Sequence, residues 1–370
     1  MPLTFDMNST YYSFLALIAT LLISSCGSGN TNQHDGYEIV VLDTLSIPFE
    51  GEVHAADFSG NRGLIYNYRS GKYLAFDSTG SILVSNSLPA EGENGLFYVN
   101  GLKILPDGEV LAHSIKGEIG LLNQNLQLKE KMFMPFPNGA MDLKRNVQIM
   151  ARWQDDLLLF YPGRDNKSPY DKGYFRDNHL LEKVNMKTGE TAPFLQLSPE
   201  SKYQQDLHFE QPTPLISVRD NQLYLAFNKE PLVHRYDLSK EGNWEESISL
   251  ETPDFVQIKG QSIPLGNDGS VLAEGEITGL YALDNGFAVS YFEGLLQEPN
   301  RTPTSLPGQQ LKWFIPEQGW SDPLSLPFEL LFLLNFEGIE NPFYAILNPL
   351  YLKGGSNEVK ILKLQVKSSL

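Results

Sequence analysis

Short β-rich segments alternate with tight turns along almost the whole chain, and this alternation is the feature that most restricts its fold. After residue 36 the helical hydrophobic period is nearly absent, and turns rich in Gly, Asn, Asp and Pro recur at intervals of roughly ten residues. Five successive sets of three predicted strands follow one another. The first set is Leu64–Tyr68, Lys72–Phe76 and Ile82–Leu88. In each set a turn joins the last two strands, and these turns begin near residues 77, 123, 185, 237 and 316. A repeat of antiparallel strands at this spacing predicts a β-propeller.

Further β-rich segments remain at the two ends of this region, at Glu38–Ile47, Leu350–Lys353 and Val359–Val366. If they pair, they build a sixth blade that closes the ring and removes its open sheet edges. The sequence therefore predicts an all-β chain that folds as a six-bladed β-propeller closed by its N- and C-terminal strands. A seven-bladed propeller remains possible if the insertions at 163–177 and 295–308 contain additional strands. A pair of β-sandwiches is the rival fold, but sandwiches lack a repeat of this period.

The N-terminal segment has the features of a secretion signal. Phe14–Ile23 is a run of ten apolar or small residues, which is too short to span a bilayer. It leads into Ile23-Ser24-Ser25-Cys26, which resembles the lipobox of bacterial lipoproteins. The resemblance implies cleavage before Cys26 and acylation of its thiol, which would give a stable membrane anchor. Residues 1–13 contain no Lys or Arg, so Met7 is an alternative start to Met1.

These features divide the chain into a lipoprotein signal peptide at 1–25, a flexible polar tether at 26–36 and a β-propeller domain at 37–370. Cys26 is the only cysteine, so its lipidation leaves no thiol for catalysis, zinc ligation or a disulfide. The formal net charge is −17. An acidic chain is repelled by nucleic acid, so no nucleic-acid partner is expected, and the expected contact with the membrane is through the lipid anchor.

The sharpest motifs lie in residues 64–97, LIYNYRSGKYLAFDSTGSILVSNSLPAEGENGLF. They are a strand, a hairpin with Tyr followed by Asp-x-x-Gly, and an acidic-Gly-x-Asn-Gly segment, here 91–95. In these traits the chain resembles a family of uncharacterised Bacteroidetes lipoproteins that are predicted to be six-bladed, TolB-like propellers. The resemblance implies a propeller in the cell envelope and no particular activity. Surface-displayed lipoproteins of this group often carry an acidic cluster after the lipidated cysteine. Here that segment holds only Asp35, so the periplasmic face of the outer membrane is expected.

The segment at 91–95 is also a candidate ligand site. Glu91, Glu93 and Asn94 offer oxygen ligands of the kind that hard cations prefer. We expect this connection between blades to reach the face around the central channel. The alternative is a turn in which Gly92 and Gly95 provide the backbone freedom and the acids are solvated. No cofactor is predicted, but binding of a divalent cation remains possible.

Two segments combine histidine with carboxylates: His54 with Asp57, and Asp206 with His208 and Glu210. On a strand the last three would share one face, where they could bind a metal or perform acid–base chemistry. The alternative is that this spacing arose by chance.

Four other residues are candidates for the wall of the channel: Arg152, Glu274, Tyr291 and Glu293. They could recognise a sugar or a peptide, and the alternative is packing at blade edges. The sequence contains none of the motifs G-x-S-x-G, G-x-x-x-x-G-K-[ST], G-x-G-x-x-G and H-E-x-x-H.

The expected function is therefore a lipid-anchored binding or scaffold module for a protein partner or a small ligand at one propeller face. Two alternatives remain. One is a hydrolase or lyase acting on carbohydrate or peptide, and the other is a sensor or accessory subunit of an envelope complex.

Overall fold

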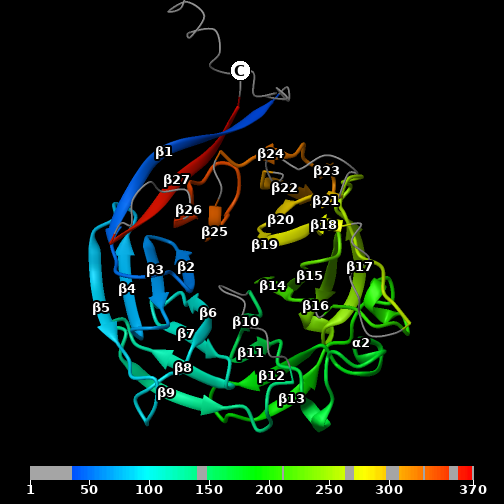
Figure 1. Cartoon of the computed structure of the whole chain (residues 1–370), viewed down its shortest axis with the longest axis horizontal. Helices are drawn as coiled ribbons and strands as arrows, with labels where there is room; N and C mark the ends of the chain where they lie inside the picture. The colour runs from blue at the N-terminus through cyan, green and yellow to red at the C-terminus, as the bar shows by residue number, and fades with distance from the viewer. Residues whose placement is uncertain are drawn as a thin grey trace, which may run out of the picture.

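The computed structural model describes residues 36–139, 148–210, 212–262, 271–296, 308–327, 330–349 and 357–368. In these residues six antiparallel sheets are arranged in a ring around a common axis (Figure 1). The six-bladed β-propeller predicted from the repeat is confirmed. The predicted signal peptide lies outside the described residues, as does all of the predicted tether except Gly36. In the described part of the chain, no helix has the length and apolar character needed to cross a bilayer.

Five blades are built in chain order from the innermost strand outward. Blade 1 contains β2 (Ala55–Ser59), β3 (Arg62–Asn67), β4 (Lys72–Asp77) and β5 (Ile82–Ser87). Blade 2 contains β6 (Val99–Ile104), β7 (Val110–Ser114), β8 (Glu118–Leu122) and β9 (Leu128–Phe133). Blade 3 contains β10 (Met150–Trp153), β11 (Asp156–Leu159), β12 (Leu181–Asn185) and β13 (Thr191–Phe194). Blade 4 contains β14 (Pro214–Arg219), β15 (Gln222–Phe227), β16 (Leu232–Asp237) and β17 (Asn243–Ser249). Blade 5 contains β19 (Glu276–Leu283), β20 (Gly286–Phe292) and β22 (Gln310–Ile315), with β23 (Gly319–Trp320) and β24 (Leu324–Ser325) both paired to β22.

The sixth blade joins the two ends of the propeller. Its strands, from the outside inward, are β1 (Tyr37–Pro48), β27 (Glu358–Ser368), β26 (Phe343–Leu347) and β25 (Leu330–Leu333). The register of β1 on β27 runs from Tyr37 opposite Ser368 to Pro48 opposite Glu358. The predicted closure by N- and C-terminal strands is therefore confirmed. The predicted segment Leu350–Lys353 lies outside the described residues, and β26 takes the place beside β27.

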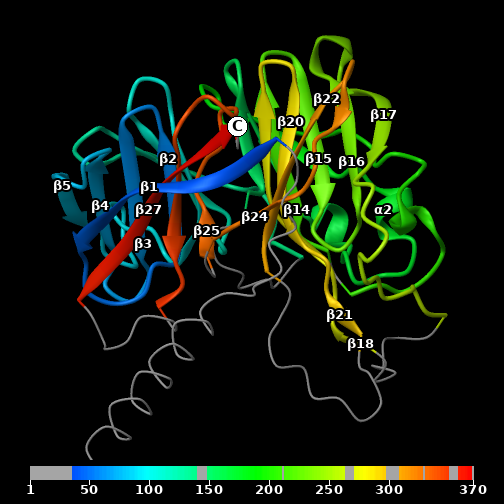
Figure 2. The ribbon, with the colours of Figure 1, turned by 90° about the horizontal axis from the view of Figure 1, so that it is seen from above.

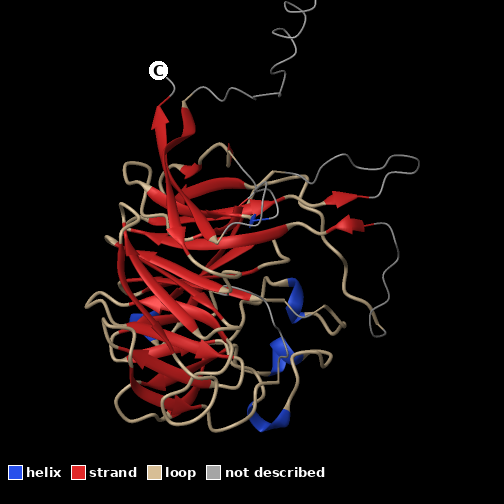
Figure 3. Ribbon diagram, turned by 60° about the vertical axis from the view of Figure 1, so that its left-hand side comes forward, coloured by secondary structure: helices blue, strands red, loops and turns tan. Residues whose placement is uncertain are grey.

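The two faces of the ring differ in the connections that they carry. The inner strands begin at one face, here the start face, and end at the other, here the end face. The start face carries the connections between blades, which include η2 (Lys202–Gln204). It also carries the connections between the two middle strands of each blade, which in blade 3 include η1 (Arg164–Asn166) and α2 (Tyr174–Asp177) (Figure 3). A small ribbon of β18 (Val271–Ala273) and β21 (Leu295–Leu296) projects from it (Figure 2). The end face carries short hairpin turns and η3 (Leu238–Lys240).

Apolar side chains fill the spaces between neighbouring blades. Blade 1 meets the closing blade where Phe58 of β2 stacks on Tyr344 of β26, with ring centroids 3.8 Å apart. A larger cluster runs through blades 2, 3 and 4 and includes Leu111, Leu158 and Leu225. Because each sheet buries its faces only against its neighbours, the closed ring is what stabilises the individual blades.

Candidate functional site

A cavity of about 380 Å³ occupies the half of the central channel that opens at the end face. All six innermost strands, or the residues that directly follow or precede them, contribute to its lining. Its volume lies within the range of roughly 300–1,000 Å³ that is usual for small-ligand pockets. A site at this place is therefore assembled from segments that are far apart in sequence.

Polar side chains join the inner strands to one another along the wall of this cavity. Asp57 in β2 accepts a hydrogen bond of 2.7 Å from the backbone N–H of Ile104 in blade 2. Tyr281 in β19 donates one of 2.8 Å to the carbonyl of Leu333 in the closing blade. Burial holds the pKa of Tyr281 well above its usual value, so the phenol keeps its proton. An inner strand is a sheet edge, and these bonds satisfy its exposed backbone groups.

The same arrangement continues across blades 3, 4 and 5. The backbone carbonyl of Gln148 accepts a 2.7 Å hydrogen bond from the N–H of Ile216. The side-chain amide of Gln148 reaches Leu280, donating to its carbonyl at 3.2 Å and accepting from its N–H at 2.9 Å. Ser217 accepts a 2.9 Å bond from the N–H of Ala282. These hydrogen bonds fix the inner strands relative to one another. The side chains that remain available to a ligand are those nearer the end face.

Three basic side chains from consecutive blades line the cavity near the end face: Lys103, Arg152 and Arg219. The side chains of Lys103 and Arg219 are 47% and 43% exposed. Lys103 lies 3.2 Å from the carboxylate of Asp57, and Arg219 forms an ion pair with Asp284 in the β19–β20 turn. Arg152 donates from Nε to the carbonyl of Gln154 at 3.0 Å. Among the described residues, no carboxylate lies within ion-pair distance of Arg152.

This concentration of positive charge stands out in a chain whose formal net charge is −17. Guanidinium and ammonium groups recognise carboxylate and phosphate through charge-assisted hydrogen bonds. Exposed ion pairs such as Arg219 with Asp284 are worth about 1 kcal/mol or less, so an incoming anion can exchange with them. The described lining contains neither histidine nor cysteine. Its chemistry is therefore suited to binding a small anion.

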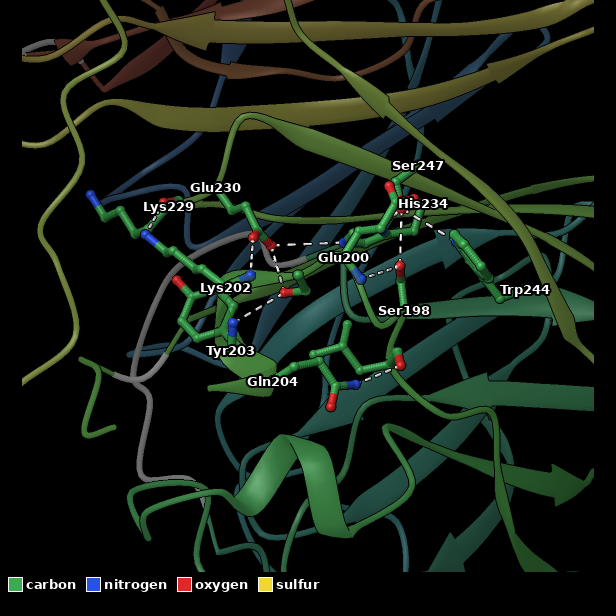
Figure 4. Close-up of polar contacts among 12 residues, drawn as sticks. Ser198, Glu200, Lys202, Tyr203, Gln204, Lys229, Glu230, His234, Trp244 and Ser247 are labelled. Atoms are coloured by element: carbon green, nitrogen blue, oxygen red, sulfur yellow. Dashed lines mark hydrogen bonds and ion pairs between the residues drawn. The ribbon is translucent and has the colours of Figure 1, made fainter. Parts of the chain in front are cut away.

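A second polar cluster lies on the start face of blade 4 (Figure 4). Glu230, between β15 and β16, is only 2% exposed. Its carboxylate accepts hydrogen bonds from Oγ of Ser201 at 2.8 Å and from the backbone N–H of Lys202 at 2.6 Å. It also lies 3.7 Å from Nε2 of His234, whose Nδ1 is 2.8 Å from Oγ of Ser247. His234 is fully buried. Through Ser247, His234 and Glu230 the network links strand β17 to the start-face loops.

Two lysines complete the cluster. Nζ of Lys202 donates to the carbonyl of Lys229 at 2.7 Å, and burial lowers the pKa of Lys202. Nζ of Lys229 lies 2.9 Å from Glu276 and 3.9 Å from Glu274. Both lysines line a hollow of about 20 Å³ together with Glu210 and Glu274, two of the residues predicted from the sequence. A hollow of this size holds about one water molecule, which is too little for an organic ligand.

The predicted acidic segment at 91–95 turns out to hold a lysine. Its side chains Glu91, Glu93 and Asn94 are exposed on the start face. Nζ of Lys131 in β9 donates to the carbonyls of Gly92 and Gly95 at 2.7 and 3.0 Å. Glu118 lies 3.7 Å from the same ammonium. The segment does bind a positive charge, but the charge is supplied by the outer strand of blade 2, away from the channel.

The expectation of one strand face for Asp206, His208 and Glu210 is wrong, because no strand forms there and β14 begins only at Pro214. Asp206 pairs with Lys172 at 2.8 Å, and His208 makes a single antiparallel bridge to Gln261. Within the described ranges, no three His, Cys, Asp or Glu side chains are grouped closely enough to hold a metal ion.

The remaining candidates separate into two groups. Glu293 accepts a 2.7 Å hydrogen bond from Thr252, and Tyr291 is buried beside Gln310, so both contribute to the packing of blade 5. Arg152 and Asp57 line the channel cavity, whereas His54 packs between two tyrosine rings. Lys103, Gln148 and Arg219 were missed, since no motif marks them and only closure of the ring brings them together.

Comparison with solved structures finds the same architecture in two proteins of Bacteroides. One is a member of the DUF4221 family from Bacteroides vulgatus, with a TM-score of 0.63, 14% identity, and coverage of 90% of this chain and 99% of the other. The other is a predicted exported protein from Bacteroides fragilis, with a TM-score of 0.53, 10% identity, and coverage of 89% and 95%. No family profile and no curated protein sequence matches the chain. At these identities the likeness establishes a shared propeller fold.

Proposed function

We propose that this protein is a lipid-anchored binding module of the bacterial cell envelope that holds a small anionic ligand at the end-face mouth of its channel. The observation that carries the proposal is the convergence of Lys103, Arg152 and Arg219, from three adjacent blades, on one cavity of ligand size. A carboxylate or phosphate group is the chemistry that these side chains fit, with Arg152 as the group best placed for a bidentate contact.

The distribution of polar groups favours binding over catalysis. The candidate carboxylates lie in separate places, with Glu91 and Glu93 beside blade 2 and Glu210 and Glu274 beside blade 4. The described lining of the channel cavity offers no histidine to activate a hydroxyl group such as that of Ser217.

Two carboxylates, Asp57 and Glu337, also line the cavity, but Asp57 is engaged by the ammonium of Lys103 and the backbone N–H of Ile104, and Glu337 is exposed. The described lining thus offers neither a nucleophile with a base nor a pair of free buried carboxylates, which favours binding over hydrolysis or elimination.

The binding proposal is tested by thermal unfolding of the purified protein with matched anionic and neutral ligands. Galacturonate, an aspartyl dipeptide and inorganic phosphate are the anions, and galactose is the neutral match for the first. At a hundredfold excess over Kd, a ligand that binds only the folded state adds about 2.7 kcal/mol of stability. We expect at least one anion to raise Tm and galactose to leave it unchanged. Equal shifts with galactose and galacturonate, or no shift with any anion, would contradict the proposal.

The anchor and the location belong to the same proposal. They are supported by the Ile23-Ser24-Ser25-Cys26 sequence and by the fold shared with a predicted exported protein. Labelling cells with an alkyne fatty acid is expected to mark the wild-type protein and not Cys26→Ala, because only the thiol accepts the lipid. Ser25→Ala keeps a small residue before the cut and should label normally. An unlabelled wild type, or a labelled Cys26→Ala, would refute the anchor.

The periplasmic face of the outer membrane is the proposed position of the domain. Protease added to intact cells should then leave the protein whole, and digestion without lysis would place the domain on the cell surface instead.

A further inference from the structure

The charged side chains around the channel cavity are not evenly distributed over the six blades. The three cations, Lys103, Arg152 and Arg219, come from the consecutive blades 2, 3 and 4. The two carboxylates of the described lining are Asp57 in blade 1 and Glu337 in the closing blade. In a ring of six blades the closing blade lies opposite blade 3 (Figure 1). Glu337 and Arg152 therefore line opposite walls of the same cavity.

The connection between β25 and β26 places Glu337 at the end-face mouth. Residues 334–337, which follow β25, all line the cavity, so the chain continues along the channel wall after the strand ends. The N–H of Leu334 donates to the carbonyl of Tyr344 at 2.8 Å, and the N–H of Tyr344 donates to Oδ1 of Asn335 at 3.0 Å. These two hydrogen bonds to β26 hold the backbone that leads to Glu337.

Glu337 and Arg152 are also the two charged side chains of the lining without a charged partner. Both are exposed. Among the described residues, no cation lies within ion-pair distance of Glu337, just as no carboxylate lies within that distance of Arg152. Each of the other charged side chains of the lining has an ion-pair partner: Asp57, Lys103 and Arg219. Unpaired charges of opposite sign on opposite walls are complementary to a ligand that carries both signs.

The charge balance of the cavity also favours such a ligand over one with several negative charges. The described lining has three cationic and two anionic side chains, so its surplus is a single positive charge. One carboxylate on the ligand neutralises this surplus. A second negative group would meet Glu337, which has no cation of the described lining beside it. An ammonium at that end instead offers three N–H donors to the carboxylate of Glu337.

We propose that the ligand of the channel is a short zwitterionic peptide whose terminal carboxylate binds Arg152 and whose terminal ammonium binds Glu337. This inference rests on the proposed function, because it identifies the anion held by the three cations as a peptide carboxylate. A free amino acid carries the same two groups close together, whereas Arg152 and Glu337 belong to opposite blades. A peptide of two or three residues separates the two charges further and suits a cavity of about 380 Å³.

Glycine peptides test the inference, because they differ only in the presence and the separation of their terminal charges. Glycine, diglycine and triglycine are titrated calorimetrically into the purified protein at low salt. We expect diglycine or triglycine to bind more tightly than glycine. N-acetyl-triglycine lacks the ammonium and triglycine amide lacks the carboxylate. Each should bind about tenfold more weakly than triglycine, because each loses one set of hydrogen bonds between charged groups.

Two variants assign the ammonium contact to Glu337. Glu337→Gln should bind triglycine about tenfold more weakly than the wild type does, because the charge that pairs with the ammonium is removed. The same variant should bind N-acetyl-triglycine with wild-type affinity, since that peptide has no ammonium. Glu340 is an exposed carboxylate of the same connection and lies outside the cavity lining. Glu340→Gln should therefore bind both peptides as the wild type does.

The inference is overturned if N-acetyl-triglycine binds the wild type as tightly as triglycine, or if Glu337→Gln keeps the full preference for the free peptide. Tighter binding of glycine than of both peptides would also overturn it. The anion site survives the first of these results, because the acetylated peptide keeps its carboxylate. If no glycine peptide binds, the inference fails, and galacturonate and phosphate still decide whether the channel holds an anion.

Discussion

Replacing Glu230 with alanine is expected to lower the free energy of unfolding by about 3–5 kcal/mol, which is the usual cost of removing one partner from a buried ionic network. The carboxylate is buried and accepts bonds from the Ser201 hydroxyl and the Lys202 backbone N–H. Alanine leaves both donors without an acceptor and removes the negative charge beside the half-buried Lys202. Urea denaturation followed by tryptophan fluorescence measures the change.

Glu246→Ala is the matched control for this substitution. Glu246 belongs to the same blade, but it is 46% exposed and pairs with Arg235 at the surface. Loss of an exposed pair costs about 1 kcal/mol or less. Equal losses in Glu230→Ala and Glu246→Ala would show that the network of blade 4 does not hold the start-face loops in place.

The second large effect is a pH dependence that originates at His113 in β7. Burial lowers the pKa of this fully buried histidine to about 4. Its Nδ1 lies 3.1 Å from Oδ1 of Asn100, and Nε2 has no hydrogen-bond partner among the described residues, which fits a neutral ring. The unfolded chain takes up the proton near pH 6.5, well before the folded one does. The contribution of His113 to stability is therefore complete above about pH 6.5 and is lost as the pH falls towards 4, at about 1.4 kcal/mol per pH unit.

Carboxylates also titrate in this range, so the prediction concerns the difference between wild type and His113→Gln. Between pH 7 and pH 4 the wild type should lose roughly 3 kcal/mol more than the variant. The exposed His179 provides a control, and His179→Gln should follow the wild-type curve at every pH. Parallel curves for wild type and His113→Gln would mean that the buried ring does not couple folding to protonation.

The three outer strands of each blade could be predicted from sequence because turns such as 77–80 separate them. The innermost strands could not. Strands β2, β6 and β10 each carry a charged residue among apolar ones: Asp57, Lys103 and Arg152. These residues line the channel cavity. The three strands are only four to six residues long and lack a run of β-branched or aromatic residues, so little in the sequence marks them as strands.

The site itself was only partly accessible to sequence reasoning. Arg152 was recognised as a channel residue, but its neighbours Lys103 and Arg219 come from other blades and share no motif with it. The segment at 91–95 was a candidate for a hard cation held by Glu91, Glu93 and Asn94, and that hypothesis stays untested. The contact that the structure shows is different, because the ammonium of Lys131 binds the backbone carbonyls of Gly92 and Gly95. That contact depends on the packing of β9 against the loop, which no sequence motif marks.

Calorimetric titration at low salt, with the anion that raises Tm most, is the decisive test of the channel site. The three proteins to compare are the wild type, Arg152→Gln and Lys129→Gln. Lys129 is an exposed cation of β9 that pairs with Glu109 outside the cavity. We expect at least tenfold weaker binding to Arg152→Gln, or about 1.4 kcal/mol, and unchanged binding to Lys129→Gln. Equal affinity in all three proteins would show that the anion binds elsewhere and would contradict the channel site.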